Sequence, residues 1–207
     1  MGEKIIYQPL TTWDKVSVVL YRGGIVIFSL VIFLLGLLST IKWKGVGWSS
    51  VLEHTDLRFL NSVLYLLYVT VGISVFTIHL YLKRFRRFIR GLYALSIASL
   101  IVMIFLRGAD LASFLLTIPV AGLLWLPLAG CISFITMKEA FCFRFIEGYI
   151  LTMLLPLFVL VFSSRMLQPS QTGTFLLLIG LLMLVFTFRK TIMPLAFDIG
   201  DKTAYET

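Results

Sequence analysis

Six runs of mostly apolar residues, separated by short polar connections, constrain the fold of this chain more than any other feature. A helix that crosses a bilayer needs about 20 predominantly apolar residues. The runs cover residues 23–41, 60–82, 91–106, 111–137, 149–162 and 174–188. The last two are short, so we expect each to borrow a turn from its flanks. The sequence therefore predicts an all-α, multi-pass transmembrane helical bundle of about six spans, with residues 1–207 forming a single integral membrane domain.

The overall composition excludes a soluble protein. Hydrophobic residues make up 59% of the chain and charged residues only 14%, whereas soluble domains carry about 45–50% and about 25%. A soluble fold of 207 residues leaves too much surface to hide so many apolar side chains. Lipid is therefore the expected surroundings of most of this chain.

The positive residues flank the apolar runs, which is the pattern that sets the orientation of a membrane protein. The net charge is +8, and the connections on the side of the N-terminus hold most of the Lys and Arg residues. We therefore predict that an interfacial stretch, 1–22, and a tail, 189–207, both face the cytoplasmic side of a plasma, inner or thylakoid membrane. A nucleic-acid partner requires a basic face on a soluble fold, so none is predicted.

Two prolines interrupt the fourth run. Pro119 and Pro127 each remove one backbone hydrogen bond, and lipid offers no substitute partner, so neighbouring helices must cover the gap. We expect a single bent helix over 111–137. The alternative is a discontinuous helix of the kind that forms a transporter site, which the absence of nearby ionisable residues disfavours.

Ionisable side chains are scarce within the runs, and this argues against catalysis and against bound cofactors. His79 is the one clear case, and we interpret it as reaching the interface. Haem or a metal ion would need a second ligand at the same depth, whereas His54 is expected on the opposite side. Cys131 and Cys142 are expected to be free thiols. No catalytic, cofactor-binding or metal-binding residue is predicted.

Two groups of polar residues on the predicted inner side are candidate sites. The candidate surface for interaction with a partner or a small polar ligand comprises Glu139, Cys142, Arg144, Glu147, Asp198, Asp201 and Lys202. The candidate lipid-headgroup site comprises Arg84, Arg86, Arg87 and Arg90. Each group also has a plainer interpretation: Arg144 and Glu147 could pair at i, i+3 on a helix, and the arginines could only anchor the topology. The tail is expected to fold back on the inner surface or to dock on a partner.

Three short segments resemble an uncharacterised family of integral membrane proteins of cyanobacteria and plastids. They are the stretch 19–23 (VLYRG), the stretch 138–143 (KEAFCF) and the tail from Arg189-Lys190 to Asp198-Ile-Gly-Asp-Lys202. The resemblance extends over nearly the whole chain. It implies a photosynthetic membrane, and it transfers no catalytic residue because the family has no established activity.

These observations favour a non-enzymatic accessory or assembly factor that binds a larger membrane protein complex. The motivation is the scarcity of polar groups within the spans, the small residues at helix spacing such as Ala94 and Ala98, and the apolar residues in the inner segments. The first alternative is a carrier for a small or lipid-like solute that uses the helix with Pro119 and Pro127. The second alternative is an intramembrane enzyme with Glu139, Arg144 and Glu147 at the inner surface.

Overall fold

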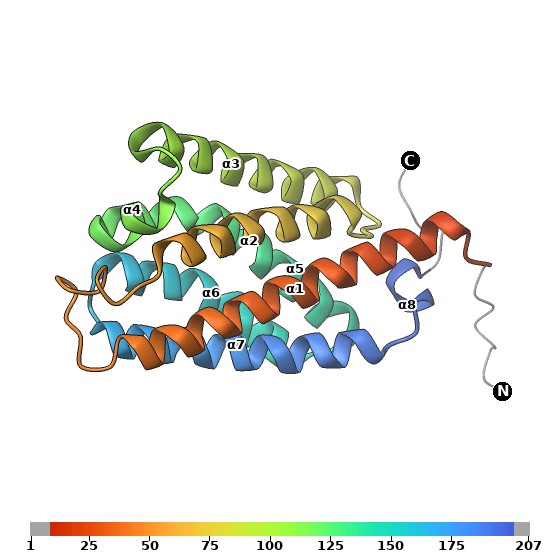
Figure 1. Ribbon diagram of the computed structural model, residues 1–207. Helices are drawn as coiled ribbons and strands as arrows, with labels where there is room; N and C mark the ends of the chain where they lie inside the picture. Colours follow the sequence, from red (N-terminus) through yellow and green to blue (C-terminus); the bar gives the residue numbers. More distant parts are fainter. Residues whose placement is uncertain (1–8, 201–207) are drawn as a thin grey trace.

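The computed structural model describes residues 9–200, and within that range the regular structure is entirely helical (Figure 1). The helices are α1 (Thr12–Lys42), α2 (Leu57–Thr77), α3 (Lys83–Arg107), α4 (Leu111–Thr117), the 3-10 helix η1 (Pro119–Trp125), α5 (Leu126–Phe143), α6 (Ile146–Ser164), α7 (Pro169–Ile192) and α8 (Ala196–Ile199). Six segments are long and apolar enough to cross a membrane: α1, α2, α3, η1 with α5, α6 and α7. The predicted six-span helical membrane protein is confirmed, and α6 and α7 extend beyond runs five and six as expected.

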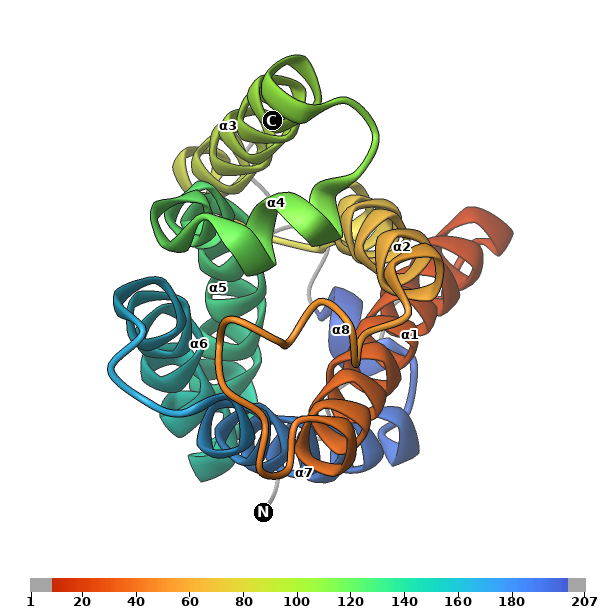
Figure 2. The same cartoon turned by 60° about the vertical axis from the view of Figure 1, so that its left-hand side comes forward.

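The helices lie roughly along one axis and form a ring (Figure 2). The start of α1, the end of α7 and α8 lie at one end of the bundle, which we call the terminal end (Figure 1). The connection between α1 and α2 lies at the opposite, far end. Helix α3 lies at the edge of the ring, against α2, α5 and η1. That the terminal end faces the cytoplasm stays a prediction from the loop charges.

The most extensive contact joins α1 and α7, and glycines allow it. A Cβ built on Gly180 of α7 would lie 2.5 Å from the Phe33 Cα of α1, and one on Gly173 would lie 2.7 Å from the Thr40 backbone nitrogen. A Cβ on Gly36 would likewise meet the backbone of Leu177. In a membrane, close approach of two helix backbones stabilises their association through packing, so these glycines hold the pair together.

The fourth run is discontinuous, so the prediction of one bent helix over 111–137 is wrong. Helix α4 ends at Thr117, η1 begins at Pro119, and α5 begins with Pro127 in its first turn. Pro119 has no N–H, so it cannot donate the helical hydrogen bond to the Leu115 carbonyl. Nη2 of Arg165 donates to the carbonyls of Leu115 and Leu116 instead, at 2.9 Å each. The expectation that a neighbouring element covers the gap is confirmed.

The second run also ends earlier than predicted. Helix α2 stops at Thr77, and Ile78, its C-cap residue, is already extended. His79 therefore lies in the connection to α3 rather than within a span, and its Nε2 atom is 3.2 Å from the Ser17 hydroxyl.

Candidate functional site

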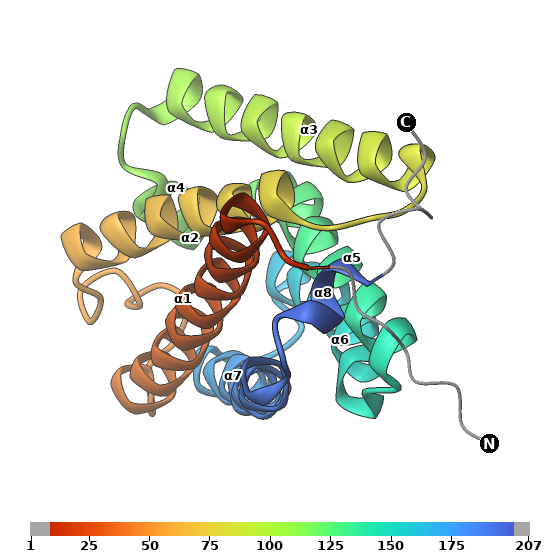
Figure 3. The ribbon, with the colours of Figure 1, turned by 90° about the vertical axis from the view of Figure 1, so that its right-hand side faces the viewer.

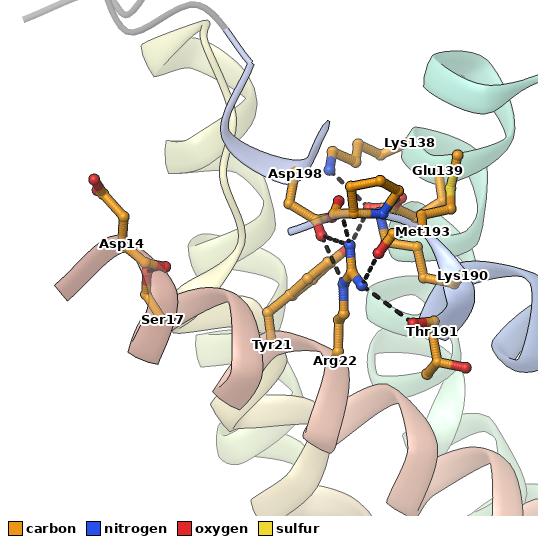
Figure 4. Close-up of polar contacts among 11 residues, drawn as sticks. Asp14, Ser17, Tyr21, Arg22, Lys138, Glu139, Lys190, Thr191, Met193 and Asp198 are labelled. Carbon is orange, nitrogen blue, oxygen red and sulfur yellow. Dashed lines mark hydrogen bonds and ion pairs between the residues drawn. The ribbon is translucent and has the colours of Figure 1, made fainter. Parts of the chain in front are cut away.

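Five charged side chains meet inside the terminal end of the bundle, and we call them the ionic cluster (Figure 4). They come from four helices: Arg22 from α1, Lys138 and Glu139 from α5, Lys190 from α7 and Asp198 from α8. The side chains of Glu139, Lys190 and Asp198 are fully buried, and those of Arg22 and Lys138 are 8% and 9% exposed. Figure 3, which views the terminal end, shows α8 lying among the helices that supply the other four side chains.

Glu139 is the anion at the centre of the first half of the cluster. Its Oε1 accepts hydrogen bonds from the Tyr21 hydroxyl at 2.6 Å and from Lys138 Nζ at 2.7 Å. Its Oε2 lies 2.5 Å from Lys190 Nζ. Lys138 also lies over the Tyr21 ring, 5.4 Å from its centroid. Three donors thus compensate one buried carboxylate, which fixes α1, α5 and α7 relative to one another.

Asp198 is the anion of the second half. Its Oδ1 pairs with Lys190 Nζ, and its Oδ2 accepts a hydrogen bond of 2.7 Å from Arg22 Nε. The Arg22 guanidinium also donates to the backbone carbonyls of Met193 at 2.5 Å and Pro194 at 3.1 Å. Both carbonyls follow the end of α7, and that of Pro194 also accepts a hydrogen bond of 3.2 Å from the Phe197 N–H. Arg22 therefore attaches the segment after α7 to α1.

The cluster contains three basic and two acidic side chains, so its formal charge is +1. Charges in a low-dielectric interior are stable only when they are paired and hydrogen-bonded. Removing one member of such a set costs about 3–5 kcal/mol. Buried ionisable groups in a membrane protein are functional candidates by default, and this makes the cluster the first candidate site.

A second candidate site is an apolar cavity of about 190 Å³ in the far half of the bundle. Helices α1, α2, α4, α5, α6 and α7 and the 3-10 helix η1 all contribute to its wall. The wall includes the apolar side chains of Ile32, Leu64, Leu128, Ile132, Leu155 and Leu176. Lys42 and Asp56, which are exposed, lie among its few polar lining residues. An apolar cavity of about 150 Å³ suffices to bind a ligand of the size of benzene, so this one is large enough for a small apolar group.

A layer of apolar side chains separates the cavity from the ionic cluster. On each of α1, α5 and α7, the residues that line the cavity lie nearest the far end, and the members of the ionic cluster lie nearest the terminal end. Between them lie the fully buried side chains of Phe28, Ile135 and Met183. Polar contacts at this level join the hydroxyls of Ser29 and Thr187 at 2.7 Å and those of Thr136 and Thr152 at 3.3 Å. The cavity is thus closed toward the terminal end by packed side chains and, beyond them, by ion pairs.

Arg165 organises the far end of the cavity. It lies 3.6 Å from the centroid of the Trp48 ring and 4.7 Å from that of Phe162, while Trp48 Nε1 donates to the Leu167 carbonyl at 2.9 Å. Burial lowers the pKa of the Arg165 guanidinium to about 10. Arg165 therefore links the α1–α2 connection, the end of α6 and the broken end of α4.

The predicted interaction surface is divided by the fold. Glu139 and Asp198 belong to the ionic cluster, and the tail folds back at α8. The expected pairing of Arg144 with Glu147 is wrong. Arg144 ends α5 in the left-handed conformation (φ 55°) and is exposed, whereas Glu147 accepts hydrogen bonds of 2.7 and 2.8 Å from Arg189. Cys142 is exposed, and Asp201 and Lys202 lie outside the described residues.

The four predicted headgroup residues lie on the first two turns of α3. Arg84 and Arg87 are exposed and line a surface groove. Arg86 donates to the Leu80 carbonyl at 3.2 Å, and the Arg90 guanidinium lies 6.0 Å from the centroid of the Phe76 ring. Two of the four side chains thus line the groove and two contact the chain itself, and the headgroup site stays a prediction.

Sequence reasoning assigned no site role to Arg22, Lys138, Lys190 or Arg165, although the first three lie in the segments that carry the family resemblance. The usable signal was that Arg22, Lys138 and Lys190 each follow or precede an apolar run by one residue or a few, at the same predicted depth. Within residues 9–200, no three His, Cys, Asp or Glu side chains lie close enough together to hold a metal ion.

Comparisons with known proteins give a family but no activity. A family model described as "Uncharacterized integral membrane protein (DUF2301)" matches residues 73–207. A protein of Haemophilus influenzae, itself described as uncharacterized, is similar to this chain, with 30% identity over 208 residues that span 100% of this chain and 99% of that protein. No solved structure matches. The relative shows that similarity to this chain extends beyond cyanobacteria and plastids.

Proposed function

The chain belongs to this DUF2301 family of integral membrane proteins, and on that premise we propose that it is a carrier for small apolar or amphipathic solutes. The observation that supports this most is the apolar cavity, which is closed toward the terminal end. The sequence alone favoured an accessory factor over a carrier, because the composition of the apolar runs gives no sign of a cavity.

The discontinuous fourth run supports the same function. Irregular backbone at membrane depth is tolerated where it is buried in protein or lines a cavity, and η1 lines this one through Gly122 and Trp125. Carriers commonly build their sites from interrupted helices near the middle of the bilayer. The apolar part of the proposed solute occupies the cavity and contacts its apolar wall. If the solute is amphipathic, its polar head lies near Lys42 and Asp56.

The test is photolabelling in lipid nanodiscs with a diazirine derivative of decanoic acid, followed by peptide mapping. We expect label on the cavity-lining parts of α5 and α7 that excess decanoic acid suppresses. Ala129→Phe, which fills the cavity, should remove that label. Ala94→Phe, on the exposed face of α3, should leave it unchanged. Label that is confined to lipid-facing residues, or that Ala129→Phe does not alter, contradicts the proposal.

An accessory or assembly role is the second candidate. It is supported by the exposed apolar residues beside the α5–α6 connection at the terminal end: Phe141 is 78% and Ile146 is 72% exposed, next to the exposed Cys142 and Arg144. The tail contributes less than the sequence suggested, because Asp198 and Ile199 are buried against the chain's own helices. An enzyme is not proposed, since Glu139 is enclosed by three donors and Glu147 is bound by Arg189.

This second role has its own test. Arg144→Glu combined with Phe141→Ser alters the exposed surface without touching the ionic cluster. Loss of a stoichiometric partner from native-membrane preparations, with the thermal stability unchanged, supports the accessory role. Migration of the unaltered protein as a small particle without partners counts against it.

A further inference from the structure

The groove at the start of α3 is formed by residues that share one face of that helix. It is lined by Arg84, Arg87, Phe88, Gly91, Leu92 and Leu95. The later residues follow Arg84 at three, four, seven, eight and eleven positions, which places them in one row along the helix. Its polar end lies at the terminal end of the bundle, and its apolar end lies deeper in the bilayer.

All the residues that line the groove belong to α3, and two of their side chains also pack against α5. The Phe88 ring packs against Phe134 of α5, with centroids 5.7 Å apart, and Leu92 lies against Gly130 of α5. A Cβ built on Gly91 meets no atom within 4 Å, so this glycine leaves open space in the middle of the row. From Arg87 to Leu95 the helix rises about 12 Å, a length suited to part of an acyl chain.

We propose that this groove binds an anionic phospholipid from the leaflet at the terminal end. Arg84 and Arg87 hold the phosphate, and Phe88, Leu92 and Leu95 contact the first half of an acyl chain. Charge complementarity selects the ligand, because α3 contains five Lys and Arg residues in its first eight positions and no Asp or Glu. The apolar continuation selects a lipid over a free phosphate ion.

The groove differs from an ordinary topology anchor in its shape and because only some of the nearby arginines face it. A topology anchor requires only positive charge near the interface. Here Arg86 and Arg90 are engaged within the chain, whereas Arg84 and Arg87 are exposed on either side of one polar end. The inference is independent of the carrier proposal, since the groove and the cavity share no residue.

The test is native mass spectrometry of the full chain extracted from vesicles that contain equal amounts of dioleoyl-phosphatidylglycerol and dioleoyl-phosphatidylcholine. We expect retention of phosphatidylglycerol in preference to phosphatidylcholine. Arg84→Gln with Arg87→Gln should weaken that retention roughly tenfold or more, because each basic residue near an anionic surface contributes a several-fold factor. Gly91→Leu should weaken it without any change of charge.

The matched control is Lys44→Gln with Arg58→Gln, which removes two exposed cations at the far end and should leave retention unchanged. Inorganic phosphate at millimolar concentration should not displace the lipid. Equal losses in the control and in the groove variants, displacement by inorganic phosphate, or full retention by Gly91→Leu would each overturn the proposal.

Discussion

Arg22 of α1 and Asp198 of α8 are separated by 176 positions in the sequence, yet Arg22 Nε donates a hydrogen bond of 2.7 Å to Asp198 Oδ2 inside the bundle. This contact, with the ion pair between Asp198 and Lys190, joins the segment after the last span to the first and last spans. The terminal end is therefore closed by residues from both ends of the described chain.

Glu139 provides the most direct test of the ionic cluster. Glu139→Gln leaves three cations with one carboxylate, and we expect it to lower the free energy of unfolding by about 3–5 kcal/mol. Adding Lys138→Met removes one of the two cations that Glu139 pairs with and should restore at least half of the loss. Thermal unfolding in mild detergent measures both.

The control for that pair is Glu53→Gln, which removes an exposed carboxylate at the far end and should shift the melting temperature little. A double variant that is less stable than Glu139→Gln alone would show that Lys138 stabilises the bundle through packing rather than through charge.

Arg165 is expected to be essential for the far end. Arg165→Ala removes both hydrogen bonds from Nη2 to the carbonyls at the α4 break, and it should lower the free energy of unfolding by roughly 2 kcal/mol. Arg165→Lys should recover less than half of this, because an ammonium group does not offer the planar fork that stacks on Trp48. Arg58→Ala, at an exposed position of the same end, serves as the control; equal effects of Arg165→Ala and Arg58→Ala would contradict the assignment.

The α1–α7 contact predicts opposite signs for two Gly→Ala changes. Gly180→Ala places a Cβ 2.5 Å from the Phe33 Cα and should destabilise the protein by about 1–3 kcal/mol. Gly23→Ala meets no atom within 4 Å and should stabilise α1 by about 0.5–1 kcal/mol. Chemical or thermal unfolding of the two variants decides; a neutral Gly180→Ala would mean that the helices are not in close contact.

The sequence predicted the helical class, the number of spans and the need for a partner at Pro119, because these follow from local composition and backbone chemistry. It did not predict the ionic cluster, because Arg22, Lys138 and Lys190 each stand at the edge of an apolar run, where a charge normally faces water or headgroups. These three side chains come together only because four helices pack against one another at the terminal end.

Small residues show the same limit. Ala94 and Ala98 have the spacing of a contact face, yet both are exposed on α3. The sequence analysis did not predict a helix contact at the glycines that do bring helices together, such as Gly173 and Gly180. Their role depends on where the α1 backbone lies, which a single sequence does not contain. The Arg165 contacts depend in the same way on the placement of α4 beside the end of α6.

We expect His79 to make the stability of the protein depend on pH. Burial first, and then the positive charge of Lys138, lower the pKa of the imidazole from its ordinary value of 6.5. The unfolded chain therefore takes up the proton at a higher pH than the folded chain. The contribution to stability is fully present above about pH 6.5, and it is lost as the pH falls from there through the lowered pKa. Between pH 7.5 and 5.5, the melting temperature should fall more for the unaltered protein than for His79→Gln; an equal fall would contradict this.

The measurement that tests the carrier account most directly is thiol accessibility in oriented membrane vesicles. The variant for this test combines Cys131→Ala, Cys142→Ser and Ala129→Cys, so that its single thiol lines the cavity. A membrane-impermeant maleimide should label it from the far-end side, and more slowly in the presence of decanoic acid. Asp198→Asn, which weakens the ionic cluster, should open labelling from the terminal-end side. A cysteine at the lipid-facing Phe105 position, 90% exposed, should stay unlabelled, and one at Glu53 should label. If the cysteine at position 129 reacts from neither side while the one at position 53 does, the cavity is not open to solutes and the carrier account is wrong.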